Sequence, residues 1–351
     1  MYSHKFDDTS ERIPGERPTP APTPMPYPAP VPPAHNGMYP SYMQPSGRDR
    51  RLRSSHFPFF TLFTAVANVV VFVLVMYINN CPANIPSSQT CILGSTFKRM
   101  SFQPFSENPL LGPSSATLTK MGGLMTTLVV QQKEGWRLMS CVWLHAGVFH
   151  IVVNLIALLV FGIQLEKDFG FFRIGLVYLV SGLGGSLLSS LFHSNTISVG
   201  ASGALFGLLG ATVSELITNW SHYRSRCSQL TQLIVLTAVN LAVGLLPHVD
   251  NFAHIGGFLT GFFLGFVILM KPQFAWVSRK DLLDPSIERP VKSRYHGYQW
   301  FLLAISTVVV IAGFAAGFYA LYSNVDVNSK CSWCHYLNCL PTSAWKCDST
   351  S

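Results

Sequence analysis

The chain has 351 residues, of which 49% are hydrophobic and only 11% are charged, and its mean hydropathy is +0.32. Because soluble globular proteins carry about 25% charged residues, this composition excludes an ordinary soluble domain and indicates a membrane protein. The net charge of +8 is not gathered in a basic patch interleaved with aromatic residues. It therefore favours attraction to the lipid bilayer, and we expect no nucleic-acid partner.

Residues 1–56 precede the first apolar run, contain the stretch PTPAPTPMPYPAPVPPAH and end in a basic segment. A segment so rich in proline cannot bury a core, which predicts a disordered cytosolic arm. The arm is either a tether or a docking site for a cytosolic partner that reads proline-rich motifs. Because the arm comes first, the following apolar run is predicted to be a signal anchor and not a cleavable signal peptide.

Apolar runs of about twenty residues follow, long enough to cross the hydrocarbon core of a bilayer as helices. Six of them are clustered and predict a core at residues 57–270. A basic linker, residues 271–298, leads to a seventh span at 299–322 and a cysteine-rich tail at 323–351. The predicted fold class is an all-α polytopic membrane protein, with spans near residues 57–78, 142–164, 171–192, 199–219, 229–246, 252–270 and 299–322.

Basic residues are concentrated before the first span and after the second, fourth and sixth spans. Cytosolic loops carry the excess of Lys and Arg, so these four segments are predicted to be cytosolic. The N-terminus is then cytosolic and the tail is lumenal or extracellular. The residues concerned are Arg48, Arg50, Arg51, Arg53, Lys167, Arg173, Arg224, Arg226 and the basic residues of 271–294.

Six of the eight cysteines fall in segments predicted to lie outside the cytosol. An even number of cysteines on that side predicts disulfides in an oxidising compartment. The motif Cys331-x-x-Cys334-His335 also fits a zinc or redox site, and the sequence leaves these alternatives open. The six are Cys81, Cys91, Cys331, Cys334, Cys339 and Cys347, whereas Cys141 and Cys227 lie elsewhere.

Polar residues occur at similar depth in three spans that run in the same direction. His150 and Asn154 lie in the second span, Ser202 in the fourth and His254 in the sixth. Taken singly, each has a structural interpretation, because a serine can cap a helix and a histidine or asparagine can bond to a neighbouring helix. Together they indicate a site near the lumenal face, since unrelated structural roles need not share one depth.

The spacing of these residues fits nucleophilic catalysis. His150 and Asn154 are four residues apart and share one helix face, where both can donate to one oxygen. Ser202 at a helix N-terminus adds its own N–H and the helix dipole, which completes an oxyanion hole. His254 can take the proton of the serine as general base and return it as acid.

Two neighbouring residues suggest alternatives. Asp250 precedes His254 by four residues and could complete a Ser-His-Asp triad, but it lies in the lumenal loop. His145 with His150 resembles a metal pair. A spacing of five would turn the two rings apart on a helix, and no carboxylate or thiol cluster joins them. We therefore expect neither a metal nor another cofactor.

Glycines supply the means for two spans to approach closely. Gly257, Gly261 and Gly265 repeat every four residues behind His254. The fourth span is similarly slim because it contains Gly203 and Gly207 with two further glycines. Small residues let helix backbones come together, so spans four and six are predicted to pack tightly and to bring serine and histidine together. Ordinary small-residue packing without a site is the alternative.

The motif Gly200-Ala201-Ser202-Gly203, the pair His150 and Asn154, and Ala253-His254 with its glycines resemble the rhomboid intramembrane serine proteases. The resemblance extends over residues 57–270, and further matches are Trp136-Arg137, Glu166, Gly170 and Arg173. It implies a six-helix bundle with a short fourth helix and a site open to water from the lumenal side. Trp136, Arg137, Glu166 and Arg173 are implied to be structural.

The resemblance also implies a role for each candidate site residue. Ser202 corresponds to the nucleophile and His254 to the base of a catalytic dyad. His150 and Asn154 correspond to the oxyanion donors. Phe206 stands where the family often has an aromatic residue against the histidine, and it completes the packing around the dyad with Gly257 and Gly261.

The seventh span and the cysteine-containing lumenal segments resemble the secretory-pathway branch of plant rhomboid-like proteins, which implies the Golgi or the plasma membrane. The implied activity is that of a serine endopeptidase that cleaves single-span membrane proteins near the lumenal face. An inactive rhomboid relative that binds membrane clients is the main alternative. A transporter is a further one, and it predicts inverted repeats and broken helices that the sequence does not show.

Overall fold

The computed structural model describes residues 56–85, 89–192, 196–220, 223, 225–245, 249–274, 293–325, 327, 330–331 and 333–337. Parts of three predicted segments lie outside the described residues. These parts are residues 1–55 of the proline-rich arm, residues 275–292 of the basic linker, and residues 338–351 of the tail, which include Cys339 and Cys347.

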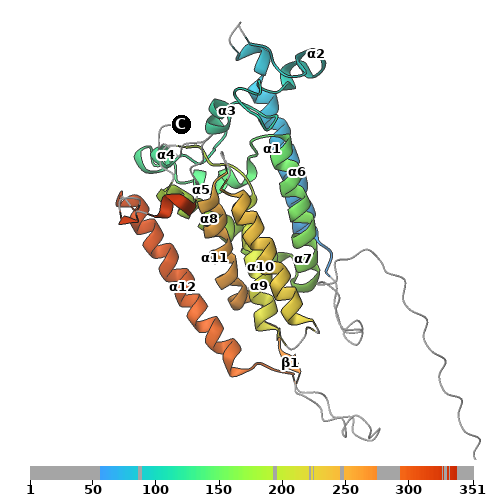
Figure 1. Cartoon of the computed structure of the whole chain (residues 1–351), viewed down its shortest axis with the longest axis vertical. Coiled ribbons are helices and arrows are strands. Elements are labelled where there is room, and N and C mark those ends of the chain that lie inside the picture. Colours follow the sequence, from blue (N-terminus) through green and yellow to red (C-terminus); the bar gives the residue numbers. More distant parts are fainter. Residues whose placement is uncertain are drawn as a thin grey trace, which may run out of the picture. The chain divides into compact units, whose positions relative to one another are not determined.

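Long helices occupy all seven predicted segments (Figure 1). The prediction of an all-α polytopic fold is confirmed; the described strands are two residues each and pair with each other, β1 (Gln273–Phe274) with β2 (Ser293–Arg294). The second span consists of α6 (Val148–Ala157), a π-helical turn η6 (Leu158–Gly162) and α7 (Ile163–Phe169). The others are α1 (Phe59–Asn79), α8 (Phe171–Phe192), α9 (Ser202–Thr218), α10 (Arg226–Val243), α11 (Asn251–Ile268) and α12 (Gly297–Tyr322).

Five of the described helical segments are long and apolar enough to cross a membrane, namely all except α9 and α10. α9 is apolar but has only 17 residues. α10 falls short because polar side chains recur along it. Thr231, Thr237 and Asn240 each donate to the carbonyl four residues earlier, which satisfies these groups within the helix and lowers the cost of placing them in lipid.

The second span begins later than predicted. Residues 142–147 were expected to be helical, but the chain forms only the short 3₁₀ turn η5 (Cys141–Trp143) and then runs as a loop to α6. The first N–H groups of α6 are bound by the segment before α3 (Ser115–Lys120), with Val148 N donating to Leu111 O at 2.9 Å. His145 consequently lies outside the helix.

The segment between α1 and α6 contains further short elements that the sequence did not reveal. The Cys81–Cys91 disulfide closes its first part. The elements are η3 (Cys81–Ala83), α2 (Gly94–Phe97), η4 (Lys98–Met100), α3 (Ser115–Lys120), α4 (Thr126–Gln131) and α5 (Arg137–Ser140).

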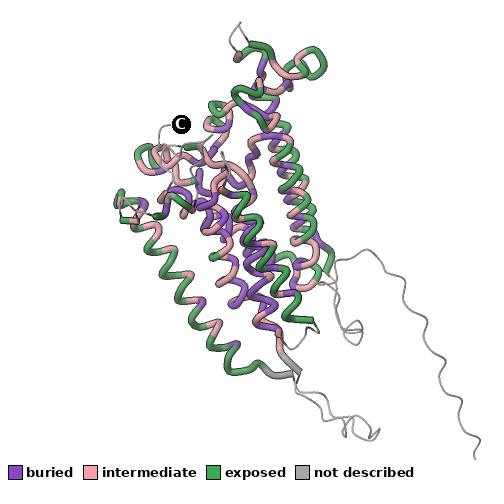
Figure 2. The backbone as a smooth tube through the Cα atoms, viewed as in Figure 1, coloured by how far each residue is buried: buried purple, intermediate pink, exposed green. Residues whose placement is uncertain are grey.

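Buried residues gather in α8, α9 and α11, whereas α12 is mostly exposed (Figure 2). The backbones of α9 and α11 touch directly. A Cβ atom built on Gly257 would lie 1.9 Å from Gly203 O, and one built on Gly261 would lie 2.0 Å from Gly207 O. No side chain fits at either place, so the glycines permit this approach.

A buried carboxylate fixes the start of α1. Glu166 of α7 is fully buried and accepts hydrogen bonds from Phe60 N at 2.7 Å and Thr61 N at 2.8 Å. The Thr61 hydroxyl also donates to it. A helix start leaves N–H groups without partners, and in a membrane they cannot be left to water. Glu166 therefore joins α1 to the second span.

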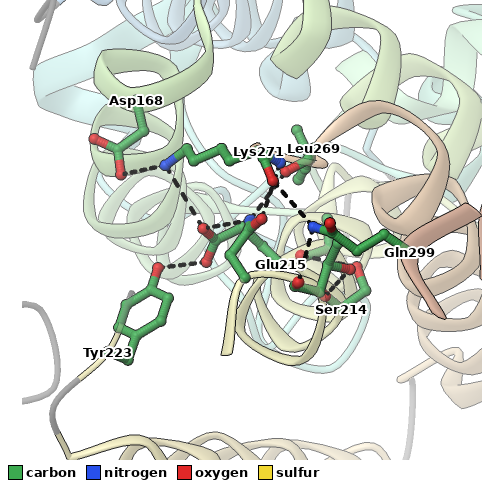
Figure 3. A network of polar contacts seen from close by, with 10 residues as sticks. Asp168, Ser214, Glu215, Tyr223, Leu269, Lys271 and Gln299 are labelled. Carbon is green, nitrogen blue, oxygen red and sulfur yellow. Dashed lines mark hydrogen bonds and ion pairs between the residues drawn. The ribbon is translucent and has the colours of Figure 1, made fainter. Parts of the chain in front are cut away.

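A polar network fixes the C-terminal end of α9 (Figure 3). Lys271 Nζ lies 3.7 Å from the carboxylate of Glu215 and 3.9 Å from that of Asp168. Gln299 of α12 donates to Thr218 O at 3.2 Å and to Lys271 O at 3.0 Å. The end of α9 that is distant from Ser202 is thus tied to α7 and α12.

The tail contributes one more described element, η9 (Cys334–Leu337), next to a disulfide between Cys331 and Cys334. Disulfides were predicted for these two cysteines and for Cys81 and Cys91. Among the described residues, Cys141 and Cys227 are free thiols.

We expect Gly261→Ala to destabilise the protein by about 1–3 kcal/mol, because its methyl group would overlap Gly207 O and force α9 and α11 apart. Thermal unfolding in detergent measures the effect. Gly313→Ala in α12 is the matched control, since a Cβ at Gly313 meets no atom within 4 Å. Equal unfolding temperatures for both variants would show that close approach of these helices contributes nothing.

Candidate active site

Ser202 is the first residue of α9 and is partly exposed. Ala201 precedes it and has no side-chain acceptor for the first turn. The N–H groups of Ser202, Gly203 and Ala204 have no hydrogen-bond partner among the described residues. Three free N–H groups at a helix N-terminus form a favourable place for negative charge.

The segment before Ser202 is held by backbone hydrogen bonds. Ser198 and Leu124 exchange N–H···O bonds of 2.9 Å in both directions, and Gly200 N donates to Cys141 O at 3.0 Å. Gly200 has φ +130°, a conformation that side chains disfavour. A Cβ there would also lie 2.6 Å from the ring of His150. Glycine is needed at this position for both reasons.

His150 and Asn154 point to the same place from α6. The Nε2 atom of His150 and the Nδ2 atom of Asn154 lie 2.8 Å and 3.7 Å from the Cβ position built on Gly200. The Nδ1 atom of His150 accepts a hydrogen bond from Ala146 N at 3.3 Å, which favours the tautomer with its proton on Nε2. Asn154 is 6% exposed and its buried Nδ2 has no partner. Two N–H donors therefore converge beside the start of α9.

His254 lies in the first turn of α11 and is buried. Phe206, one turn along α9 from Ser202, stacks on it with ring centroids 4.3 Å apart and an interplanar angle of 15°. The buried Nδ1 atom of His254 has no hydrogen-bond partner. The imidazole is thus fixed by ring packing and not by a carboxylate.

The residues next to Ser202 and His254 touch each other. A Cβ built on Gly203 would lie 3.1 Å from Ala253 O. Ser202 and His254 therefore occupy the facing first turns of two helices in backbone contact. Among the described residues, no hydrogen bond joins their side chains. Such bonds are often formed only once substrate is bound.

Asp250 acts as the N-cap of α11. One carboxylate oxygen accepts from Ala253 N at 3.0 Å, and the other accepts a short hydrogen bond from the Ser189 hydroxyl of α8. Both oxygens are bonded to these two groups, and neither accepts a hydrogen bond from Nδ1 of His254. This arrangement gives Asp250 a structural role in place of the third triad position.

The expectation that the rings of His145 and His150 are turned apart is wrong. Their centroids lie 5.4 Å apart at 63°, because His145 belongs to the loop before α6 and folds back onto the helix. Among the described residues, no group of three or more His, Cys, Asp or Glu side chains could hold a metal ion.

The further residues suggested by the resemblance lie outside this cluster. Arg137 is buried and donates to Thr119 O at 2.6 Å and to Gly123 O at 2.9 Å, while its neighbour Trp136 is exposed. Arg173 is exposed in the first turn of α8.

Sequence reasoning missed the conformational role of Gly200 and the capping role of Asp250. A glycine just before a predicted helix start is a signal for the first. An Asp three residues before Ala253 in the run Asp250-Asn251-Phe252-Ala253 is a signal for the second, since Asp is a strong N-cap residue.

Comparison with known proteins gives consistent matches. Residues 132–271 match the family model described as Rhomboid domain. RHOMBOID-like protein 1 of Arabidopsis thaliana is 53% identical over 84% of this chain and 74% of its own length. RHOMBOID-like protein 6, mitochondrial, of the same plant is 48% identical over 86% of this chain and 97% of its own length. Inactive RHOMBOID-like protein 8, also of that plant, is 39% identical over 80% of each chain.

Proposed function

The chain belongs to the rhomboid family, and we propose that it is an active serine endopeptidase that cuts single-span membrane proteins with a Ser202–His254 dyad. Family membership by itself supports a function of the intramembrane-protease type. The observation that carries the finer proposal is the convergence of unpartnered donors at Ser202. The His150 and Asn154 donors lie beside Gly200, next to the free N–H groups in the first turn of α9, and a set of donors of this kind suits the stabilisation of an oxyanion.

The reaction follows from these positions. The Ser202 hydroxyl attacks the scissile carbonyl carbon while its proton passes to Nε2 of His254. The carbonyl oxygen becomes an oxyanion that accepts N–H bonds from His150, Asn154 and Ser202 N. The C–N bond then breaks, and the leaving amine takes the proton from His254. Water hydrolyses the acyl-enzyme with His254 again as base, which restores the free serine.

An inactive, client-binding protein is the alternative, because relatives named as inactive exist. Ser202 and His254 are both present here, and each stands in the geometry described above. A binding factor has no need of two side-chain donors that converge beside a serine hydroxyl. The activity proposal therefore accounts for more of the site.

Labelling of the detergent-solubilised protein with a fluorescent fluorophosphonate tests the dyad. We expect labelling of the wild type and none of Ser202→Ala. His254→Ala should slow labelling by at least about 10²-fold through loss of the base. Asn154→Ala should slow it by about 10²–10³-fold through loss of an oxyanion donor.

Gly313→Ala in α12 is the control, and it should label like the wild type because a Cβ at Gly313 meets no atom within 4 Å. Equal labelling of the wild type and Ser202→Ala would exclude the proposed activity. Release of a client that survives Ser202→Ala would instead support the binding factor.

We propose that substrates carry small or helix-breaking residues near the cut. A peptide bond inside a stable helix has its carbonyl hydrogen-bonded and shielded by side chains, so the substrate must unwind to reach Ser202. Glycine and proline lower the cost of unwinding.

Replacing the small or helix-breaking residues of a cleaved substrate with leucine should abolish its cleavage, measured by immunoblotting of the released ectodomain. The same replacements at the cytosolic end of the substrate helix serve as the control and should leave cleavage unchanged. Undiminished cleavage after the first set of changes would contradict the unwinding step.

We further propose that the protein resides in a secretory-pathway membrane, in the Golgi or at the cell surface, with a cytosolic N-terminus. The Cys81–Cys91 and Cys331–Cys334 disulfides support this, because both lie on the side predicted to face away from the cytosol. One similar protein is named as mitochondrial, and a mitochondrial location is the alternative.

Glycosylation acceptor sites inserted between Cys81 and Cys91 or after the tail should be modified in cells, whereas a site in the N-terminal arm should not. The expected result is a mobility shift that is reversed by a glycosidase. Modification of the arm alone would show that the orientation is opposite to the proposed one. A protein that is found in mitochondria and has no modified site would exclude the secretory pathway.

A further inference from the structure

The described part of the tail forms a closed turn. A disulfide cross-links Cys331 and Cys334 at the start of this turn, and Cys334 N donates to Cys331 O at 3.3 Å. Tyr336 N donates to Trp333 O at 3.1 Å within η9. Cys334 is buried although it follows the last span. The turn is therefore packed against the protein.

Asn251 connects this turn to the helices that carry the site. Its side-chain Nδ2 atom donates to Leu337 O of the turn at 2.6 Å and to Leu241 O in the last turn of α10 at 3.2 Å. The residue is 3% exposed. A side-chain amide has two N–H donors, so both are used in joining the tail and α10 to the first residue of α11.

His254 follows Asn251 by three residues and lies in the same helical turn. The other side of this turn is fastened to α8 through Asp250, which caps α11 and accepts from Ser189. Side-chain hydrogen bonds therefore hold the first turn of α11 on two sides, to α8 through Asp250 and to α10 and the tail through Asn251. The position of the imidazole depends on both.

We propose that Asn251 is a positioning residue for His254 and acts through the disulfide-closed turn of the tail, so that reduction of Cys331–Cys334 lowers the reactivity of Ser202. The proposal rests on the proposed function. Reduction by a dithiol converts the disulfide to two thiols while the dithiol becomes a disulfide. The opened turn regains conformational freedom, Leu337 O is presented to Asn251 less often, and the first turn of α11 is held more weakly.

The test uses the full-length protein with Cys339→Ser and Cys347→Ser, so that the tail contains only the cysteine pair of interest. The rate of fluorophosphonate labelling is measured with and without dithiothreitol, together with kcat and KM on a cleaved substrate. Loss of one hydrogen bond predicts labelling about three- to tenfold slower after reduction, with the loss in kcat and not in KM.

Cys331→Ser with Cys334→Ser should show the same loss without reductant and no further response to it. Asn251→Ala should lose at least this factor, because it also removes the hydrogen bond to Leu241 O. Adding the tail variant to Asn251→Ala should cause no further loss, because the hydrogen bond to Leu337 O is then already absent. Cys81→Ser with Cys91→Ser is the control and should keep the full response to dithiothreitol. Additive losses, or a response that disappears in this control, would overturn the proposal.

Hydrogen exchange of the amides of residues 251–257 gives a measurement that needs no catalysis. Exchange should be faster in the Cys331→Ser and Cys334→Ser variant than in its parent, and unchanged exchange would overturn the proposal even if the protein is an active protease. If the parent protein never labels, but the tail variant exchanges faster than the parent, the result would instead refute the proposed function alone. The tail variant carries this test by itself if Asn251→Ala does not fold.

Discussion

Contact between the backbones of α9 and α11 is the constraint on which the candidate site depends. Lipid provides little hydrophobic drive for helices to associate, so close van der Waals contact must hold them together. Gly203 faces Gly257 and Gly207 faces Gly261 at distances that exclude any side chain. Each glycine costs a helix about 0.5–1 kcal/mol relative to alanine, and the contact must offset this. The register of the contact sets the first turn of α9 beside the first turn of α11.

The described helices differ in whether a carboxylate side chain accepts hydrogen bonds from the N–H groups of the first turn. Glu166 satisfies the first N–H groups of α1, and Asp250 satisfies that of Ala253 in α11. Both carboxylates fix helices relative to one another. The first N–H groups of α9 have no such partner among the described residues, and Ala201 cannot supply one. The α9 start carries Ser202, and free N–H donors at this place are what the proposed reaction requires, because it develops negative charge on the carbonyl oxygen.

Much of this arrangement could be predicted from the sequence because it depends on local spacing. The seven apolar segments, the i, i+4 pair of His150 and Asn154, and the small residues of the two central helices all follow periodic patterns. Other features depend on which groups tertiary folding brings together. The contact of His145 with His150 follows from where α6 begins, and the contact of Asn251 with the tail joins residues 86 positions apart. The polarity of α10 could have been noticed, since its Gln, Thr and Asn residues are visible in the sequence.

The central claim is that a hydroxyl on α9 and an imidazole on α11 share one pocket with the donors of α6. An experimental structure of the protein reacted with a fluorophosphonate tests it most directly. The account predicts phosphorus bonded to Ser202 Oγ, with the phosphoryl oxygen within hydrogen-bond distance of His150 Nε2 and Asn154 Nδ2, and His254 Nε2 facing Ser202 Oγ. Phosphorus on another residue, or His254 turned away from the adduct, would contradict it.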